Sequence, residues 1–335
     1  MTLKQKSKNL LSNLLRFGLS GALLVYLYNT IDVDKTWNAV KSADGGFIAL
    51  AFLVFMVINY ILLMRWNIFI NALGLRAPFL SIARYFFVGL FGNLFLPSAI
   101  GGDIIKTIGL CQVSHSEKPK VVASALLDRL SGFAAIALVA VISFFVGYVL
   151  KVIEDRSLLV GIVMIAGGSV SIGVVLFNEK IYSFCCKIFQ IFPKFQKALM
   201  QMHYDIALLR ERKDAIYKAI GVSCFSQLCM ATTFFLTAKA LHQDVPLLYC
   251  IIFTPLICVA SCVPSIGGLG VREAAAAFLF VRVGVDSGVA VSIVFIGSSV
   301  FMMLVGLLGG AFYMLTKNPE EEAAIKKALK AEQGT

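Results

Sequence analysis

Charged residues are scarce in this chain of 335 residues, and their scarcity excludes a water-soluble globular fold. Only 15% of the residues are charged, whereas 59% are hydrophobic, and the mean hydropathy is +0.86. A typical globular domain that faces water carries about 25% charged residues. The composition therefore predicts an integral membrane protein.

Catalytic and metal-binding signatures are also missing. The sequence holds three histidines, in separate polar loops, and no HExxH, GxSxG or Walker motif. Its eight cysteines lie mostly within apolar spans, apart from the adjacent pair Cys185 and Cys186, and show no CxxC or zinc-type spacing, so we interpret them as small apolar packing residues. We therefore expect that the chain is not an enzyme and binds no cofactor or metal.

Acidic residues number 19 against 30 lysines and arginines, which gives a net charge of +11. The bases stand in short loops between apolar runs and not on one polar face, so we expect phosphate-containing membrane lipids, and no nucleic acid, as partners. The distribution of bases among the loops predicts a multi-pass membrane protein with both termini in the cytoplasm. We expect it in the bacterial inner (plasma) membrane.

Long apolar segments are what the sequence does contain. A helix that crosses about 30 Å of hydrocarbon needs roughly 20 apolar residues. Six segments approach or exceed this length and are predicted as full spans: 17–31, 45–64, 128–150, 157–178, 219–238 and 287–316. The bases Arg65, Arg76 and Arg84 are assigned to the loop that follows the second span.

Two further apolar segments, 80–112 and 246–283, contain breaks that a simple crossing helix would not tolerate. The first runs from Pro97 through Ser-Ala-Ile-Gly-Gly-Asp, and the second runs from Pro264 through Ser-Ile-Gly-Gly. Unpaired backbone groups cost several kcal/mol each in lipid, so such breaks persist only where they line protein or a wet cavity. We predict two re-entrant broken-helix hairpins that enter from opposite faces.

The order of these segments repeats along the chain. Span, span, hairpin and span over 1–150 recur over 157–316 from the opposite face, an inverted-topology plan that many secondary transporters use. The predicted fold is an all-α polytopic membrane domain covering 1–335, with six full spans plus the two hairpins. A chance match of small residues is the alternative. Residues 179–218 are expected to form a cytoplasmic interfacial insert, and 317–335 a charged C-terminal tail.

The two breaks and the segment after the first define a candidate substrate-binding site. Glycines allow a ligand to approach the backbone closely, and the half-helix after them presents N–H groups and a positive dipole end to phosphate. Charges at membrane depth cost roughly 2.5–3.5 kcal/mol each, so those at the breaks need partners, which the other repeat could supply. The site comprises Asn93, Pro97, Gly101, Gly102, Asp103, Lys106, Asp128, Arg129, Pro264, Gly267, Gly268, Gly270, Arg272 and Glu273.

Each of these polar groups also has a structural interpretation. The charges at the breaks either hold a headgroup or form an ion network that pins the hairpins together. Asp128 and Arg129 either line the inner mouth or are ordinary interfacial charges. Asn93 either caps the break or makes an interhelical hydrogen bond. Small residues at 306–310 pack within or between subunits, which leaves the oligomeric state open.

Three stretches resemble the signature segments of the flippase-like transmembrane domain of lysylphosphatidylglycerol synthases. They are 93–106 (NLFLPSAIGGDIIK), 127–132 (LDRLSG) and 264–273 (PSIGGLGVRE), and the resemblance covers nearly the whole chain. One departure is Ile266, where many relatives carry a second proline. The soluble aminoacyl-transferase domain of full-length synthases is not expected in this chain.

The resemblance implies lipid translocation without lipid synthesis. The leading hypothesis is a flippase-like transporter that moves an anionic or aminoacylated phospholipid, or a polyprenyl-phosphate lipid, between leaflets. Its headgroup would be held at the two half-helix N-termini. One alternative is a membrane subunit of a lipid-headgroup transferase. Another is a non-transporting scaffold that recruits a glycosyltransferase or another lipid-modifying enzyme through residues 179–218.

Overall fold

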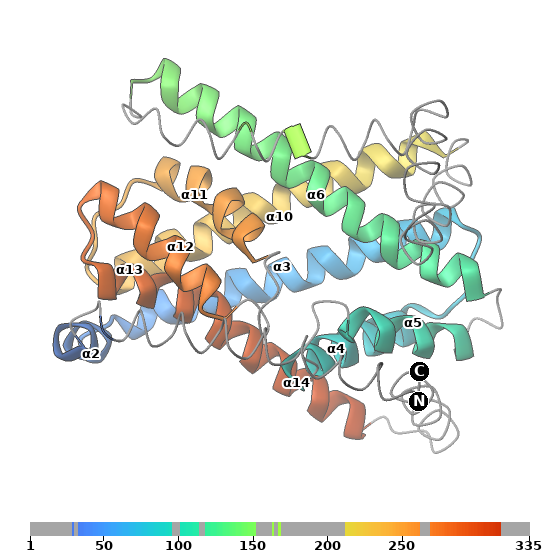
Figure 1. Ribbon diagram of the computed structural model, residues 1–335. Coiled ribbons are helices and arrows are strands. Elements are labelled where there is room, and N and C mark those ends of the chain that lie inside the picture. Colours follow the sequence, from blue (N-terminus) through green and yellow to red (C-terminus); the bar gives the residue numbers. More distant parts are fainter. Residues whose placement is uncertain are drawn as a thin grey trace, which may run out of the picture.

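The computed structural model describes residues 29, 33–95, 101–113, 118–151, 163, 167–168, 212–261 and 269–315. Every regular element within these ranges is helical (Figure 1). Four helices are long and apolar enough to cross a membrane: Gly45–Ala72, Pro119–Val149, Lys213–Ala240 and Ser287–Leu315. The chain is therefore a polytopic membrane protein. The predicted spans 17–31 and 157–178 lie outside the described residues, apart from isolated positions, and so does the tail 317–335. Of the predicted insert 179–218 the structure describes 212–218, and 213–218 form the start of the helix Lys213–Ala240, which therefore begins before the predicted residue 219.

Two long helices form the centre of the molecule and lie side by side (Figure 1). They are α3 (Gly45–Ala72) and α10 (Lys213–Ala240). The backbone N–H of Asp44, just before α3, donates to the carbonyl of Ala240 at 2.9 Å, so the start of one helix meets the end of the other. Asp44 also caps α3 with its carboxylate, a contact worth about 1 kcal/mol. The two helices are thus antiparallel.

Shorter helices occur in two consecutive pairs, in the two segments where the sequence contains its breaks. The pairs are α4 (Phe79–Phe95) with α5 (Gly101–Val113), and α11 (Leu247–Ala260) with α12 (Val271–Phe280). The links 96–100 and 262–268 lie outside the described residues. Figure 1 shows the pairs toward opposite ends of the central helices, because α4 follows α3 and α11 follows the antiparallel α10.

The pair α4 and α5 is antiparallel and packs at glycines. A Cβ atom added to Gly102 would lie 2.2 Å from the carbonyl oxygen of Gly89, and one added to Gly109 would lie 2.0 Å from the ring of Tyr85. Such distances are shorter than any van der Waals contact, so these positions tolerate only glycine at this helix separation. The hydrogen atom in place of a side chain lets α5 approach α4 closely.

Each short pair also packs on the last span of the other half of the chain. The last span of the first half is α6 (Lys118–Val149). That of the second half is continuous from α13 (Ser287–Val294) through the π-helical turn η3 (Phe295–Val300) to α14 (Phe301–Leu315). Helix α4 packs along α14, and α11 packs along α6. The two halves therefore interlock.

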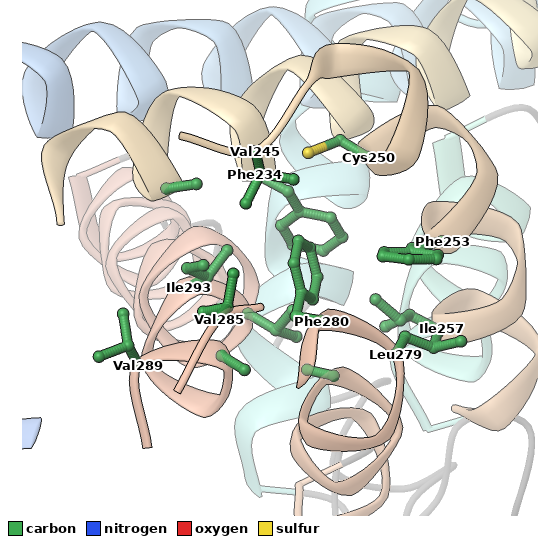
Figure 2. Packing of buried hydrophobic residues seen from close by; sticks show 14 of the residues in the cluster. Phe234, Val245, Cys250, Phe253, Ile257, Leu279, Phe280, Val285, Val289 and Ile293 are labelled. Atoms are coloured by element: carbon green, nitrogen blue, oxygen red, sulfur yellow. The ribbon is translucent and has the colours of Figure 1, made fainter. Parts of the chain in front are cut away.

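Aromatic side chains form the core that holds α12 in place. Phe234 of α10, Phe253 of α11 and Phe280 of α12 are fully buried in one cluster, shown in Figure 2. The rings of Phe253 and Phe280 meet edge to face with centroids 5.2 Å apart. Such pairs add about 0.5–1.5 kcal/mol beyond burial of their area. This cluster fixes the position of α12, whose first turn carries two of the predicted site residues.

The small residues of α14 pack within the subunit. A Cβ atom added to Gly309 would lie 2.4 Å from the carbonyl oxygen of Phe87 in α4, and one added to Gly310 would lie 2.6 Å from the ring of Phe91. This close approach is typical of small-residue faces between membrane helices. The sequence left open whether these small residues pack within or between subunits. At Gly309 and Gly310 the packing is within the subunit.

Some predicted bounds are wrong. Helix α3 continues past residue 64 to Ala72, so Arg65 lies inside a span and not in a loop. Helix α6 begins at Lys118 and not near 128, so Asp128 and Arg129 lie well inside the helix. Arg84 lies within α4. A charge does not end a membrane helix when a partner on a neighbouring helix neutralises it, and sequence order does not reveal such partners.

Candidate functional site

Five charged side chains from three helices meet inside the bundle. Arg65 comes from α3, Asp103 and Lys106 come from α5, and Asp128 and Arg129 come from α6. We call these five residues the ion cluster. Arg65, Lys106 and Asp128 are at most 9% exposed, whereas the side chain of Arg129 is 35% exposed and forms the rim.

Each carboxylate of the ion cluster bridges two cations. Asp128 accepts from Arg65 Nε at 2.6 Å through Oδ1 and lies 3.4 Å from Lys106 Nζ through Oδ2. Asp103 lies 3.0 Å from Lys106 Nζ and also pairs with Arg129. Lys106 is thus held between both carboxylates. The result is a continuous chain of ion pairs that joins the first turn of α5 to α3 and α6.

Neighbouring side chains fix the cations in position. Arg65 Nη1 donates to Ser223 Oγ of α10 at 3.1 Å, which ties the ion cluster to the second half of the chain. Lys106 Nζ lies 4.9 Å from the centroid of the Trp66 ring, a cation–π contact. The Trp66 indole N–H in turn donates to Ser124 Oγ at 3.2 Å. The cluster is therefore preorganised by both halves.

The charge balance of the ion cluster favours an anion. Three cations and two carboxylates give these five side chains a net charge of +1. An isolated charge among membrane helices costs roughly 2.5–3.5 kcal/mol, so excess positive charge there attracts a negative group. A phosphate oxygen that accepts from a lysine or arginine forms a charge-assisted hydrogen bond worth about 1.5–3 kcal/mol.

The N-terminus of α5 lies next to the ion cluster and is capped from α4. Gly101 is the first residue of α5, and the buried Gly102 donates its backbone N–H to Asn93 Oδ1 at 2.9 Å. Asn93 belongs to α4, so one contact serves both as the cap and as the interhelical hydrogen bond that the sequence left as alternatives. Asp103 in the first turn of α5 and Lys106 in the second turn then pair with residues of α6.

The N-terminus of α12 is occupied by a carboxylate of the protein itself. Gly270, at φ 84°, precedes the helix, and its N–H donates to Glu273 Oε2 at 2.8 Å. Glu273 is 1% exposed, and its other oxygen accepts from Ser299 Oγ of η3 at 2.8 Å. Arg272 Nη2 donates to the same hydroxyl at 3.3 Å. At this second break, the Glu273 carboxylate thus accepts from the Gly270 N–H, a backbone donor that the sequence predicted to bind a headgroup.

Helix α10 lies between the two groups of polar residues. Ser223, which binds Arg65, is one turn from Gln227, and residues four apart share a helix face. The Cys258 thiol of α11 donates to Gln227 Oε1, with the sulfur 3.8 Å from the oxygen. Polar side chains of α10 therefore bond α3 on one side and α11 on the other.

The predicted site residues fall into three groups. Asn93, Gly101, Gly102, Asp103, Lys106, Asp128 and Arg129 come together, whereas Gly270, Arg272 and Glu273 form a second group around Ser299. The prolines and glycines Pro97, Pro264, Gly267 and Gly268 lie outside the described residues. Asp103 and Lys106 pair within the first half and not with the charges of the second break.

The sequence interpretation missed Arg65, Ser223 and Ser299. Arg65 follows an uncharged run of 20 residues, 45–64, and was therefore assigned to a loop. The sequence offers one signal for a buried partner of Arg65, which is the acid Asp128 inside another apolar segment. No pattern distinguishes Ser223 or Ser299 from the many serines that bond their own helix backbone.

Comparison with known proteins supports the resemblance seen in the sequence motifs. Residues 13–309 match the family model described as the lysylphosphatidylglycerol synthase TM region. The chain is 23% identical over 307 residues to the UPF0104 membrane protein PH1989 of Pyrococcus horikoshii, covering 83% of this chain and 89% of that protein. It is 24% identical over 304 residues to a UPF0104 membrane protein of Methanothermobacter thermautotrophicus, covering 82% and 86%. The chain therefore belongs to the lysylphosphatidylglycerol synthase transmembrane-region family of membrane proteins.

Proposed function

We propose that this protein is a lipid transporter that moves a lipid with a phosphate-containing headgroup between membrane leaflets. The substrate is an anionic or aminoacylated phospholipid or a polyprenyl-phosphate lipid. The headgroup binds at the ion cluster, while the hydrocarbon chains stay in the bilayer. The chain carries out no chemistry on the lipid.

The ion cluster is the observation that carries this proposal. Its five charges lie among membrane-spanning helices, where a purely structural role is more easily met by apolar packing. Charged side chains inside spans usually mark the path of a substrate or ion. Arg129, on the rim and 35% exposed, offers the first contact, and Lys106, buried in the second turn of α5, offers the deeper one.

The interlocked helices support an alternating mechanism. The pairing of α4 with α14 and of α11 with α6 is reciprocal, as expected when two halves share one fold in inverted orientation. In this proposal, 1–150 and 157–316 are inverted repeats, and α4–α5 and α11–α12 are re-entrant hairpins. Rocking of the repeats exposes the ion cluster to one leaflet and then to the other.

A leaflet-exchange assay tests the proposal. The protein is reconstituted into vesicles that contain headgroup-labelled phosphatidylglycerol, lysylphosphatidylglycerol or undecaprenyl phosphate, and label accessibility is followed from outside. We expect Lys106→Gln to slow exchange of the transported lipid by roughly tenfold to a hundredfold, the effect of one charge-assisted hydrogen bond. Lys218→Gln is the matched control, because Lys218 is an exposed lysine that faces Asp214 at 4.0 Å. Equal exchange of all three lipids in protein-free and protein-containing vesicles would overturn the proposal.

A second candidate function is that of a membrane subunit of a lipid-headgroup transferase, which the description of the family favours. In that case the purified protein, given charged transfer RNA and labelled phosphatidylglycerol, yields an aminoacylated product. We expect no product, because a transporter moves the lipid between leaflets without changing its mass. A product by mass spectrometry would favour the transferase.

A further inference from the structure

A half-open apolar groove lies between α2 (Val33–Lys41) and the last span, away from the ion cluster. It has a volume of about 350 Å³, within the range of small-molecule sites. Its walls are the side chains of Thr36, Trp37, Val40, Ser292, Phe295, Ile296 and Val300. Carbon atoms dominate these walls, which suits a hydrocarbon chain and not a polar ligand.

The groove is built by fixed contacts. A Cβ atom added to Gly288 would lie 1.9 Å from Thr36 Oγ1, so α2 is seated directly on the first turn of α13. The turn after α2 is held by His242 Nε2, which lies 2.9 Å from the carbonyl oxygen of Ser42. Ala39 and Val40 also pack against the aromatic core of Figure 2. Helix α2 is therefore anchored along its length, and the space beside it is preformed.

The position and charge of α2 indicate what enters the groove. Figure 1 shows α2 at one end of the spans, where a membrane surface would lie. Trp37, 56% exposed, is an aromatic residue of the type enriched at that surface. Lys41 Nζ lies 5.2 Å from the centroid of the Trp37 ring, next to the groove. A lipid whose chain fills the groove would bring its phosphate beside this lysine.

We infer that the groove binds one acyl chain of an anionic phospholipid, with the phosphate beside Lys41. This lipid differs from the transported one and can be bound whether or not the protein transports lipids. The groove shares η3 with the second polar group: Phe295, Ile296 and Val300 face the groove, while Ser299 bonds Glu273. A chain in the groove would therefore contact the π-helical turn η3, whose Ser299 bonds Glu273 at the start of α12.

Fluorescence of Trp37 tests the inference, because the chain has only two tryptophans and Trp66 is fully buried. The full chain is reconstituted into phosphatidylcholine vesicles with rising fractions of phosphatidylglycerol brominated on its acyl chains. The Trp37→Phe variant supplies the background from Trp66. We expect quenching of Trp37 to saturate at a low fraction of brominated lipid, whereas lipids exchanging freely around the protein quench in proportion to their fraction.

Variants that fill the groove separate this site from ordinary surrounding lipid. Val300→Phe and, independently, Val40→Phe should abolish the saturating component, and Leu307→Phe, on an exposed face of α14 outside the groove, should preserve it. Lys41→Ala should raise the half-saturating fraction roughly fivefold, the effect of one lysine at a membrane surface. Brominated phosphatidylcholine should bind the unsubstituted protein as weakly as brominated phosphatidylglycerol binds the Lys41→Ala variant. Quenching that stays proportional to lipid fraction, or that is unchanged in both phenylalanine variants, would overturn the inference.

Discussion

Arg65 shows how a single buried charge takes its role from residues distant in sequence. Its partner Asp128 is 63 positions away, and its second partner Ser223 is 158 positions away. Both contacts are buried. The Asp128 carboxylate and the Ser223 hydroxyl therefore accept hydrogen bonds from a guanidinium that would otherwise be unpaired in the low-dielectric interior of the bundle. A loop arginine would have exposed its guanidinium to water instead. The function of this residue is therefore decided by packing and not by its neighbours in the chain.

Replacing Asp128 with alanine should destabilise the protein by about 3–5 kcal/mol, because it leaves Arg65 and Lys106 buried without this shared carboxylate. Denaturant unfolding in mixed micelles measures the loss. Asp214→Ala is the control, since Asp214 is exposed and its pairing with Lys218 should contribute less than about 1 kcal/mol. In a double-mutant cycle, adding Arg65→Ala should cost less than the sum of the single changes. A loss below about 1 kcal/mol for Asp128→Ala would contradict the role assigned to this carboxylate.

At the scale of elements, the short helices depend on close backbone contact. Gly102 brings α5 against α4, and Gly309 brings α14 against the other side of α4. Without an aqueous phase to drive association, membrane helices gain stability mainly from such packing and from hydrogen bonds. Helix α4 is therefore held on two faces, which fixes the start of α5 and with it the ion cluster.

The substitution Gly309→Val should destabilise the protein by about 1–3 kcal/mol, because its side chain would overlap the backbone of Phe87 and force α4 from α14. Thermal unfolding of the detergent-solubilised protein measures the effect. In contrast, Gly221→Ala in α10 should be neutral or stabilise the protein by about 0.5–1 kcal/mol, since no atom beyond the adjacent backbone of α10 lies within 4 Å of the added carbon. Similar unfolding temperatures for both variants would show that this contact is loose.

At the scale of the molecule, α3 and α10 form an antiparallel pair around which the described helices assemble. Each has 28 residues, or about 42 Å of helix, which is sufficient to cross the bilayer. The chain leaves α3 at one end of the bundle to enter α4, and leaves α10 at the other end to enter α11 (Figure 1). The two short pairs thus start from opposite ends of the bundle.

Protease sites inserted after Arg76 and after Gln243, in the loops that follow α3 and α10, should be cleaved from opposite faces of the membrane. The physical reason is that the two helices run antiparallel and each is long enough to span. Proteoliposomes of known orientation, treated with protease outside and then after lysis, report the accessible face. Cleavage of both sites from the same face would refute this topology and the inverted repeat proposed from it.

The membrane class, the places of the two breaks and most of the polar residues of the ion cluster follow from the sequence itself. Hydropathy is a local property, and Pro, paired Gly and charges are conspicuous in an apolar segment. The continuation of α3 past Arg65, the start of α6 at Lys118, the role of Ser223 and the occupation of the α12 N-terminus by Glu273 depend on tertiary structure. These features rest on contacts between residues far apart in the chain. A helix continues through a buried charge only where the tertiary structure places a partner for that charge on a neighbouring helix.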